Sequence, residues 1–231
     1  MVFGEGGKGK GAAPRRCSLT RLIPERVPLT THYSFELEAE QKCEAYLQQA
    51  VSVDPSNPEV YQTLASVRLS QVRNDEARDA LERSMRLWIG LEPGHSFIPL
   101  YDSRIALVKM LLELSLYSRA FVVLEGLQKE NDQVVDLWYL YGWAYYCQGE
   151  ETKEEEERKG MWEDARECLE QAVNLYQQQE PDDEGMLQHS QELIQKIDGV
   201  MPRGDDEDED EDEDEEGNGE GEVDDDEEME V

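Results

Sequence analysis

The side chains that stand out chemically in this sequence are carboxylates and aromatic rings. Its 231 residues contain 55 Asp and Glu against 22 Lys and Arg, which gives a formal charge of -33. The three histidines, His32, His95 and His189, are scattered, and no cluster of His, Cys and Asp has the spacing of metal ligands. No glycine-rich phosphate loop follows a strand. We therefore expect a protein that is not an enzyme and uses no metal or cofactor, with each histidine on the surface or capping a helix.

The negative charge is concentrated at the C-terminal end. Asp205 to Glu230 contain 20 carboxylates, and no base follows Arg203. A segment so charged and so poor in apolar residues cannot bury enough surface to offset its ordering entropy, so residues 201–231 are predicted to form a disordered acidic tail. Direct binding to nucleic acid or to an anionic membrane is disfavoured, because both need Lys and Arg to neutralise phosphates. Basic proteins are the favoured partners, and the tail either attracts such a client or only keeps the protein soluble.

The N-terminal part indicates an intracellular protein. Residues 1–32 combine glycines and prolines with six bases against two acids, which is typical of a flexible basic leader. They lack the apolar core of a secretory signal, and no run of about 18 apolar residues indicates a transmembrane helix. The expected location is the cytoplasm and the nucleus. The four cysteines are Cys17, Cys43, Cys147 and Cys168. Their spacing matches neither a metal knuckle nor a small disulfide framework. They are expected to be reduced thiols, three of them in apolar helical stripes.

The residues from Ser34 to Val200 show a helical periodicity that repeats along the chain. Four helices share a small or apolar residue, a Leu four positions later and another small or apolar residue three positions further. These triplets are Cys43, Leu47 and Ala50; Ala77, Leu81 and Ser84; Ala120, Leu124 and Leu127; and Ala165, Leu169 and Ala172. Each of the last three follows another helix, whose equivalent residues Leu64, Leu107 and Tyr141 are 43 and 34 residues apart. Antiparallel helix pairs on a basic period of about 34 residues are typical of the tetratricopeptide repeat.

The stretch WYLYGWAYY carries the most specific match to this repeat. Trp138, Gly142 and Tyr145 occupy the Trp, Gly and Tyr positions of the pattern W-x2-L-G-x2-Y, with Tyr141 in place of Leu. The glycine is expected to let the two helices of a pair approach closely. The sequence therefore predicts an all-α fold, a right-handed tetratricopeptide-repeat (TPR) solenoid of antiparallel helix pairs over residues 33–200. We expect a monomer.

Two segments exceed the basic period. Residues 89–99 are predicted to form a loop between the second and third repeats, because the segment contains Pro and Gly. The charged segment GEETKEEEERKG, residues 149–160, lies between the two helices of the fourth repeat. It either extends both helices into solvent or stays mobile.

Each end of a solenoid needs a cover for its last apolar face. A helix after Pro181, with an apolar stripe within Met186–Ile197, is the expected C-terminal cap. The helix predicted over residues 35–53 has no obvious partner, because two prolines break the segment before it. Either the leader folds over this helix irregularly, or the chain lacks a helix that its relatives have.

The first helix of each pair lines the concave surface of a TPR solenoid, so residues opposite its packing stripe are expected to face a client-binding groove. Four of these are carboxylates and three are aromatic; the set is Glu59, Gln62, Asp102, Ile105, Glu113, Asp136, Tyr139, Trp143 and Tyr146. Acids beside rings suit a basic, partly apolar segment, since Arg and Lys gain ion pairs and cation-π contacts. The alternative is that the aromatics pack between repeats and the acids are only a solvated face. An anionic peptide end would be repelled.

The segment DQVVDLWYLYGW, residues 132–143, followed by the acidic insertion, WEDARECLEQAVNLY and an acidic C-terminus, resembles the fungal dedicated assembly chaperones of the fourth large-subunit ribosomal protein. The resemblance extends from about Ser34 to the C-terminus. It implies a TPR superhelix that captures a long basic internal loop of the newly made ribosomal protein, shields it and escorts it to pre-ribosomes. The residues themselves indicate only a basic client. An acidic TPR histone chaperone and a general TPR scaffold are the alternatives.

Overall fold

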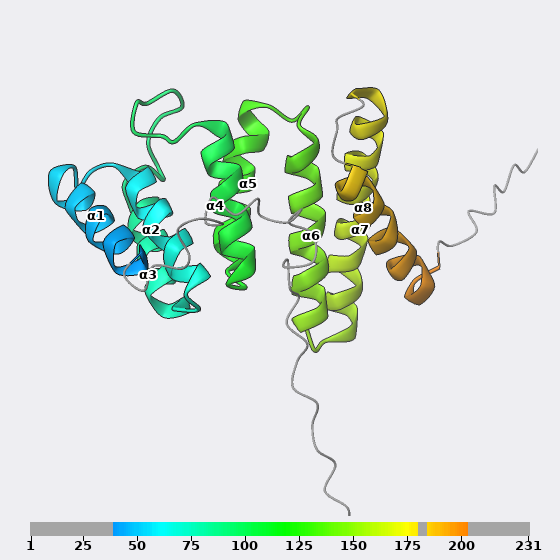
Figure 1. Cartoon of the computed structure of the whole chain (residues 1–231). Coiled ribbons are helices and arrows are strands. Elements are labelled where there is room, and N and C mark those ends of the chain that lie inside the picture. The colour runs from blue at the N-terminus through cyan, green and yellow to red at the C-terminus, as the bar shows by residue number, and fades with distance from the viewer. Residues whose placement is uncertain (1–38, 180–183, 203–231) are drawn as a thin grey trace, which may run out of the picture.

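The computed structural model describes residues 39–179 and 184–202, and every regular element within these ranges is a helix (Figure 1). The helices are α1 (Ala39–Val53), α2 (Pro58–Ser70), α3 (Asn74–Arg86), α4 (Tyr101–Glu113), α5 (Tyr117–Glu130), α6 (Val135–Glu151), α7 (Glu155–Gln179) and α8 (Glu184–Val200). The predicted basic leader and the acidic tail from residue 203 onward lie outside the described residues.

The helices lie side by side in a row of antiparallel pairs. α2 packs on α3, α4 on α5 and α6 on α7, with α1 before these described pairs and α8 after them (Figure 1). Buried apolar side chains form a continuous core from Leu64 in α2 to Ile197 in α8. The TPR solenoid predicted from the repeated triplets is confirmed.

The turns within the first two pairs have the same backbone geometry. Val72 between α2 and α3 has φ 61°, and Ser115 between α4 and α5 has φ 56°. In both turns the next N–H donates back to the preceding helix, from Arg73 to the Arg68 carbonyl and from Leu116 to the Leu111 carbonyl, each at 2.9 Å. This bond closes the end of a helix around a left-handed residue. The repeat is therefore present in the local backbone as well as in the packing.

The close approach of α6 and α7 depends on Gly142. A Cβ atom on this residue would lie 2.5 Å from Leu169 Cγ and 3.0 Å from the Ala165 carbonyl oxygen. Ala165 and Leu169 are fully buried. The expected role of the glycine is confirmed, because any side chain at position 142 would push the two helices apart.

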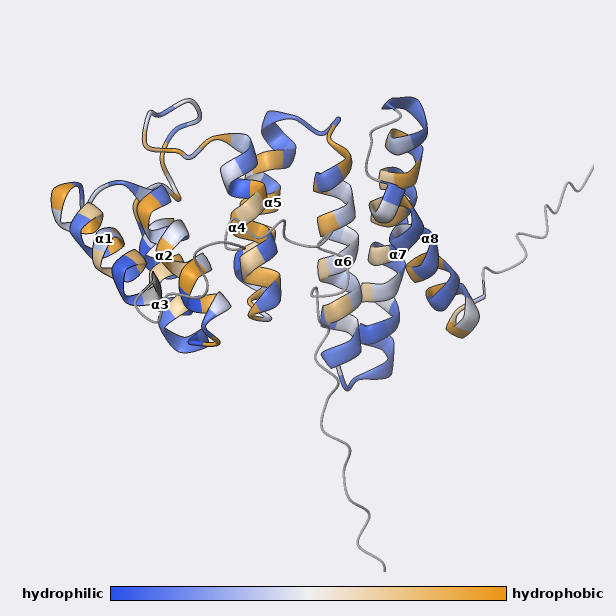
Figure 2. Cartoon of the chain, viewed as in Figure 1, coloured by the Kyte–Doolittle hydropathy of each residue, from blue (hydrophilic) through white to orange (hydrophobic). Residues whose placement is uncertain are grey.

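The charged insertion extends both helices of the last pair. α6 continues to Glu151 and α7 begins at Glu155, so this pair projects beyond its neighbours as a hairpin with a hydrophilic tip (Figure 2). Trp162 packs against Gly149, where a Cβ atom would lie 2.7 Å from the indole ring. The Tyr117 hydroxyl of α5 donates to Glu151 at 2.9 Å. Of the two predicted states of the insertion, helix extension is the observed one.

The two ends of the row differ. α8 covers the last pair with a stripe that includes Ser190, Leu193 and Ile197, each about 1% exposed, so the predicted cap is confirmed. α1 packs on α2 but leaves Tyr46 70% exposed and its predicted stripe residue Cys43 exposed. The expectation that Cys43 lies in a buried stripe is wrong, because no described element covers that face of α1.

Candidate functional site

Two contacts between neighbouring pairs show that the first helices present a common surface. The Ser103 hydroxyl of α4 donates to Glu59 of α2 at 2.8 Å. Lys109 of α4 forms an ion pair with Asp136 of α6 at 2.9 Å. We call the face of α2, α4 and α6 that carries Glu59, Asp102, Glu113 and Asp136 the inner surface. Glu59 and Asp136 are thus each linked to α4, the helix that carries Asp102 and Glu113.

The position of Glu59 is fixed by the start of α2. The Asn57 side chain accepts the Glu59 backbone N–H at 3.0 Å, and Pro58 occupies the first turn. Asn at the N-cap followed by Pro is a favourable helix start. The Asn side chain accepts an N–H group that has no partner within the helix, and Pro has no N–H group that would need one. The carboxylate of Glu59 thus leaves α2 in its first turn, where it reaches α4.

Most carboxylates of the inner surface carry uncompensated charge. The side chains of Glu59, Asp102 and Glu113 are exposed and form no ion pair with another described residue. Asp136 is half-buried and already paired with Lys109. Three free acids and one neutralised acid remain, which favours a cationic ligand through charge attraction.

Four of the predicted groove residues are buried. Gln62 and Tyr139 are each 6% exposed, Ile105 is 7% exposed and Trp143 is 6% exposed. This corrects the expectation that they face an open groove. The two aromatic rings lie beneath α8, and Gln62 and Ile105 are enclosed within the row of helices. Tyr139 and Trp143 are thus packing residues, as the alternative interpretation held, although their partner is the capping helix α8.

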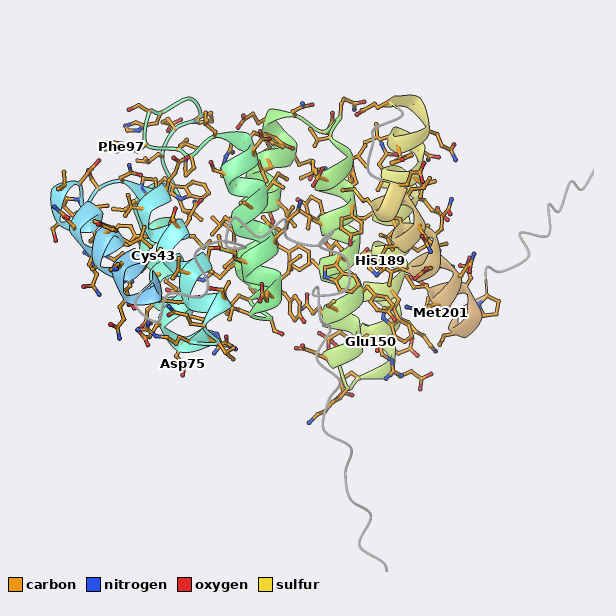
Figure 3. All side chains as sticks on the ribbon, viewed as in Figure 1. Cys43, Asp75, Phe97, Glu150, His189 and Met201 are labelled. Carbon is orange, nitrogen blue, oxygen red and sulfur yellow. The ribbon has the colours of Figure 1, made fainter. Side chains whose placement is uncertain are left out.

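His189 of α8, labelled in Figure 3, is the residue that contacts both rings. Its Nδ1 lies 3.0 Å from the Tyr139 hydroxyl, and its ring centroid is 4.7 Å from that of Trp143. Burial lowers the pKa of His189 to about 4, assisted by the charge of Lys196. The expectation of a surface or capping histidine is therefore wrong for His189. Its position in the α8 stripe, between Met186 and Leu193, is the sequence feature that could have predicted this burial.

Tyr146 is the last of the predicted aromatics. Its side chain is half-buried and stacks between Trp143 and Trp162, with ring centroids 6.2 and 6.3 Å away. It joins the inner face of α6 to the extended part of α7. Tyr146 is thus the one predicted groove aromatic that keeps substantial exposure.

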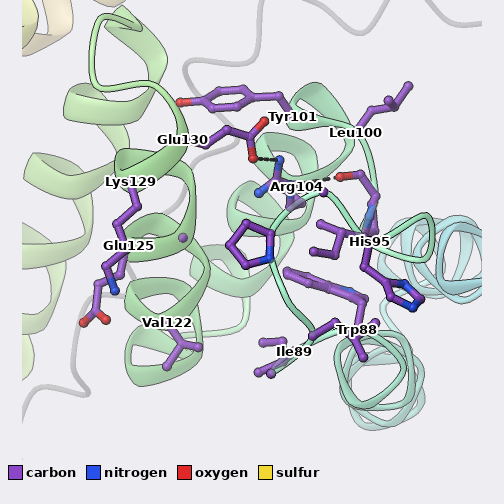
Figure 4. Close-up of a pocket in the computed structure, with 17 residues that line it drawn as sticks. Trp88, Ile89, His95, Leu100, Tyr101, Arg104, Val122, Glu125, Lys129 and Glu130 are labelled. Carbon is purple, nitrogen blue, oxygen red and sulfur yellow. Dashed lines mark hydrogen bonds and ion pairs between the residues drawn. The ribbon is translucent and has the colours of Figure 1, made fainter.

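The long loop between α3 and α4 borders a cleft of about 830 Å³ against α5 (Figure 4). Arg104, 5% exposed, donates to the Pro99 carbonyl at 2.9 Å and pairs with Glu130, so it fixes the loop to α5. Leu100 and Val122 are 76% and 45% exposed beside the cleft. The predicted loop over residues 89–99 is confirmed, and this cleft lies outside the inner surface.

Across residues 39–179 and 184–202, no group of His, Cys, Asp and Glu side chains is arranged to hold a metal ion. Among the helices in these ranges, none is long and apolar enough to cross a membrane.

Curated proteins and a solved structure resemble this chain. The "probable assembly chaperone of rpl4" of Emericella nidulans is 39% identical over 177 residues, which cover 71% of this chain and 46% of the relative. The protein of the same name from Schizosaccharomyces pombe is 35% identical over 198 residues, which cover 83% of this chain and 57% of the relative. The chain thus spans about half the length of the curated relatives it matches. Both relatives are named as chaperones and not as enzymes.

The solved structure of the assembly chaperone of RpL4, Acl4, is 44% identical in sequence and superimposes with a TM-score of 0.50. The match covers 53% of this chain and 43% of that one. No family model matches the chain. The resemblance to the fungal assembly chaperones of the fourth large-subunit ribosomal protein, stated from the sequence, is confirmed.

Proposed function

We propose that this chain is a dedicated chaperone that binds a basic segment of the newly made fourth large-subunit ribosomal protein, shields it and escorts it to pre-ribosomes. Its similarity to chaperones named for that protein supports the client. The observation that carries the mechanism is the row of exposed acids on the inner surface, Glu59, Asp102 and Glu113, which no described basic residue neutralises. A client with many Lys and Arg supplies the missing charge.

The proposed mechanism is binding without catalysis. The acids of the inner surface pair with the client, and the acidic tail after Arg203 adds long-range attraction that raises the encounter rate. A bound basic segment is thereby kept from nonspecific contact with RNA, while the chaperone itself, with its charge of -33, does not bind nucleic acid or an anionic membrane. The chain acts as a monomer and needs no cofactor.

Delivery of a ribosomal protein to pre-ribosomes requires activity in both the cytoplasm and the nucleus. A fluorescent fusion expressed at its native level should therefore be found in both compartments. Confinement to one compartment would contradict this part of the proposal.

The client is tested by purifying the tagged full-length protein from its own cells and identifying the copurified proteins by mass spectrometry. The expected result is strong enrichment of the fourth large-subunit ribosomal protein over all other ribosomal proteins. Enrichment of core histones instead would favour an acidic TPR histone chaperone. Partners of ordinary charge, with little dependence on salt, would favour a general scaffold.

A further inference from the structure

A second cleft, of about 540 Å³, lies between α5 and α7 over α6. Four aromatic rings line it: Phe121, Trp138, Tyr141 and Tyr145. Phe121 and Tyr145 have ring centroids 4.5 Å apart, and Trp138 and Tyr141 have centroids 6.0 Å apart. The cleft therefore has aromatic walls that are contributed by α5 and α6.

The polar groups of two of these rings are already engaged. The Trp138 indole N–H donates to the Asp132 carbonyl at 2.6 Å, and the Tyr141 hydroxyl donates to Gln128 at 3.1 Å. These bonds fix how the rings are oriented. A ligand in the cleft would consequently meet ring surfaces more than hydrogen-bonding groups.

Three carboxylates surround the rings: Glu125, Asp164 and Glu167. All three are exposed, and none forms an ion pair with another described residue. Their charges act inside the cleft, because Asp164 and Glu125 add to the effect of burial in raising the pKa of Tyr145. Burial and the charges of Asp164 and Glu167 also raise the pKa of the Cys168 thiol to about 12, so this cleft residue stays neutral. The cleft is anionic and contains no compensating cation among the described residues.

This cleft is distinct from the inner surface. Because an α-helix turns about 100° per residue, the centre of the Trp138, Tyr141 and Tyr145 stripe lies roughly 150° around α6 from the predicted groove stripe. The carboxylates come from α5 and α7, the second helices of their pairs, whereas the inner surface is formed by first helices. A ligand could therefore occupy both sites.

We propose that the cleft between α5 and α7 binds an arginine side chain of a basic peptide. A guanidinium is planar and delocalised, so it can stack on an aromatic ring while its N–H groups donate to two or more carboxylates. The ammonium of lysine offers a compact charge without a stacking plane, and an apolar side chain would leave the three acids unpaired. The source of the peptide rests on the proposed function: a long basic segment of the client could be held at the inner surface and at this cleft together.

The probe is a short capped peptide, Gly-Arg-Gly-Arg-Gly, added to the full-length protein. Binding is followed by heteronuclear NMR of the tryptophan indole N–H signals, with the signal of Trp138 assigned through the variant Trp138→Phe. The expected result is a saturable shift of the Trp138 signal. The same peptide with citrulline in place of arginine keeps the shape without the charge and should leave this signal in place.

The double variant Glu125→Gln and Glu167→Gln should bind the arginine peptide about tenfold more weakly, because it removes two charges without changing side-chain size. The matched control, Glu154→Gln and Glu157→Gln in the α6–α7 hairpin, should bind like the unmodified protein. An unmoved Trp138 signal, equal binding of the citrulline peptide, or full binding by the cleft double variant would each overturn the arginine site.

The same samples separate this site from the proposed client. Binding of the ribosomal loop together with an empty cleft would overturn the arginine site alone. Occupation of the cleft by the arginine peptide without any binding of the ribosomal loop would overturn the proposed client alone.

Discussion

The Tyr139 hydroxyl on α6 and Nδ1 of His189 on α8 lie 3.0 Å apart, 50 residues distant in sequence. Through this contact the capping helix covers part of the face that the repeat pattern assigns to ligand binding. Trp143 lies against the same imidazole. On the inner surface, the acids of α2 and α4 therefore remain exposed, whereas α8 covers the middle of α6.

Acid should weaken the docking of α8. The pKa of His189 is about 4 in the folded protein, below its usual 6.5, because the ring is buried. The unfolded state therefore binds a proton more readily than the folded state does. The stability that the neutral imidazole contributes is present above pH 6.5 and is lost as the pH falls from 6.5 towards 4. The contribution of His189 between pH 7 and about pH 4.5 is about 2–3 kcal/mol.

This loss is measured by urea unfolding at the two pH values. Carboxylates titrate in the same window, so the quantity compared is the pH dependence of the wild type minus that of His189→Gln. A variant with the same pH dependence as the wild type would contradict the role of the buried imidazole.

Replacement of Gly142 by Ala should lower the free energy of unfolding by about 2–3 kcal/mol, because the new methyl group would overlap Leu169 and crowd the Ala165 carbonyl. Gly126 in α5 is the matched control, since a Cβ atom there meets nothing within 4 Å. Gly126→Ala should stabilise the protein by about 0.5–1 kcal/mol, because Ala loses less backbone entropy in a helix. Equal effects of the two substitutions in chemical unfolding would argue against close helix packing at Gly142.

Val72→Gly should stabilise the protein by about 1 kcal/mol. Val72 has φ 61° and is 80% exposed, so its β-branched side chain strains the turn and contributes little burial. Val122 in α5, 45% exposed in a regular helix, is the comparison, and Val122→Gly should destabilise by about 0.5–1 kcal/mol. Thermal unfolding of the two variants distinguishes them, and a loss of stability in Val72→Gly would show that the turn is not strained.

Reversal of the free acids on the inner surface, by Glu59→Lys, Asp102→Lys and Glu113→Lys, should weaken binding of the basic ribosomal loop at least about tenfold. Helix content in circular dichroism should stay unchanged, because all three side chains are exposed. Asp79→Lys, Glu154→Lys and Glu157→Lys make the same change in net charge elsewhere. If this control weakens binding equally, net charge and not the inner surface determines affinity.

The helix pairs were predictable because their signals are local and repeated. The triplets Ala77, Leu81 and Ser84 and Ala120, Leu124 and Leu127 are almost completely buried, as their helical spacing indicated. The role of Gly142 was predictable as well, because a glycine at this position of the repeat pattern indicates that the neighbouring helix leaves no room for a side chain.

The accessibility of the groove was harder to predict, because it depends on contacts between distant segments. Tyr139 and Trp143 occupy groove positions by spacing, and only the placement of α8 decides that His189 covers them. The cleft beside Trp138 depends likewise on acids from α5 and α7, which lie about 40 residues apart in the chain. Sequence spacing along one helix contains neither relationship.

The central claim is tested most directly by calorimetric titration of the purified full-length chain with the long basic internal loop of the fourth large-subunit ribosomal protein. The account predicts saturable binding that weakens at least about tenfold between roughly 0.1 M and 0.4 M salt, since the affinity comes from charge pairs. A scrambled loop of identical composition should bind more weakly. No saturable binding at the lower salt concentration, or equal affinity for the scrambled loop, would contradict a dedicated chaperone of this protein.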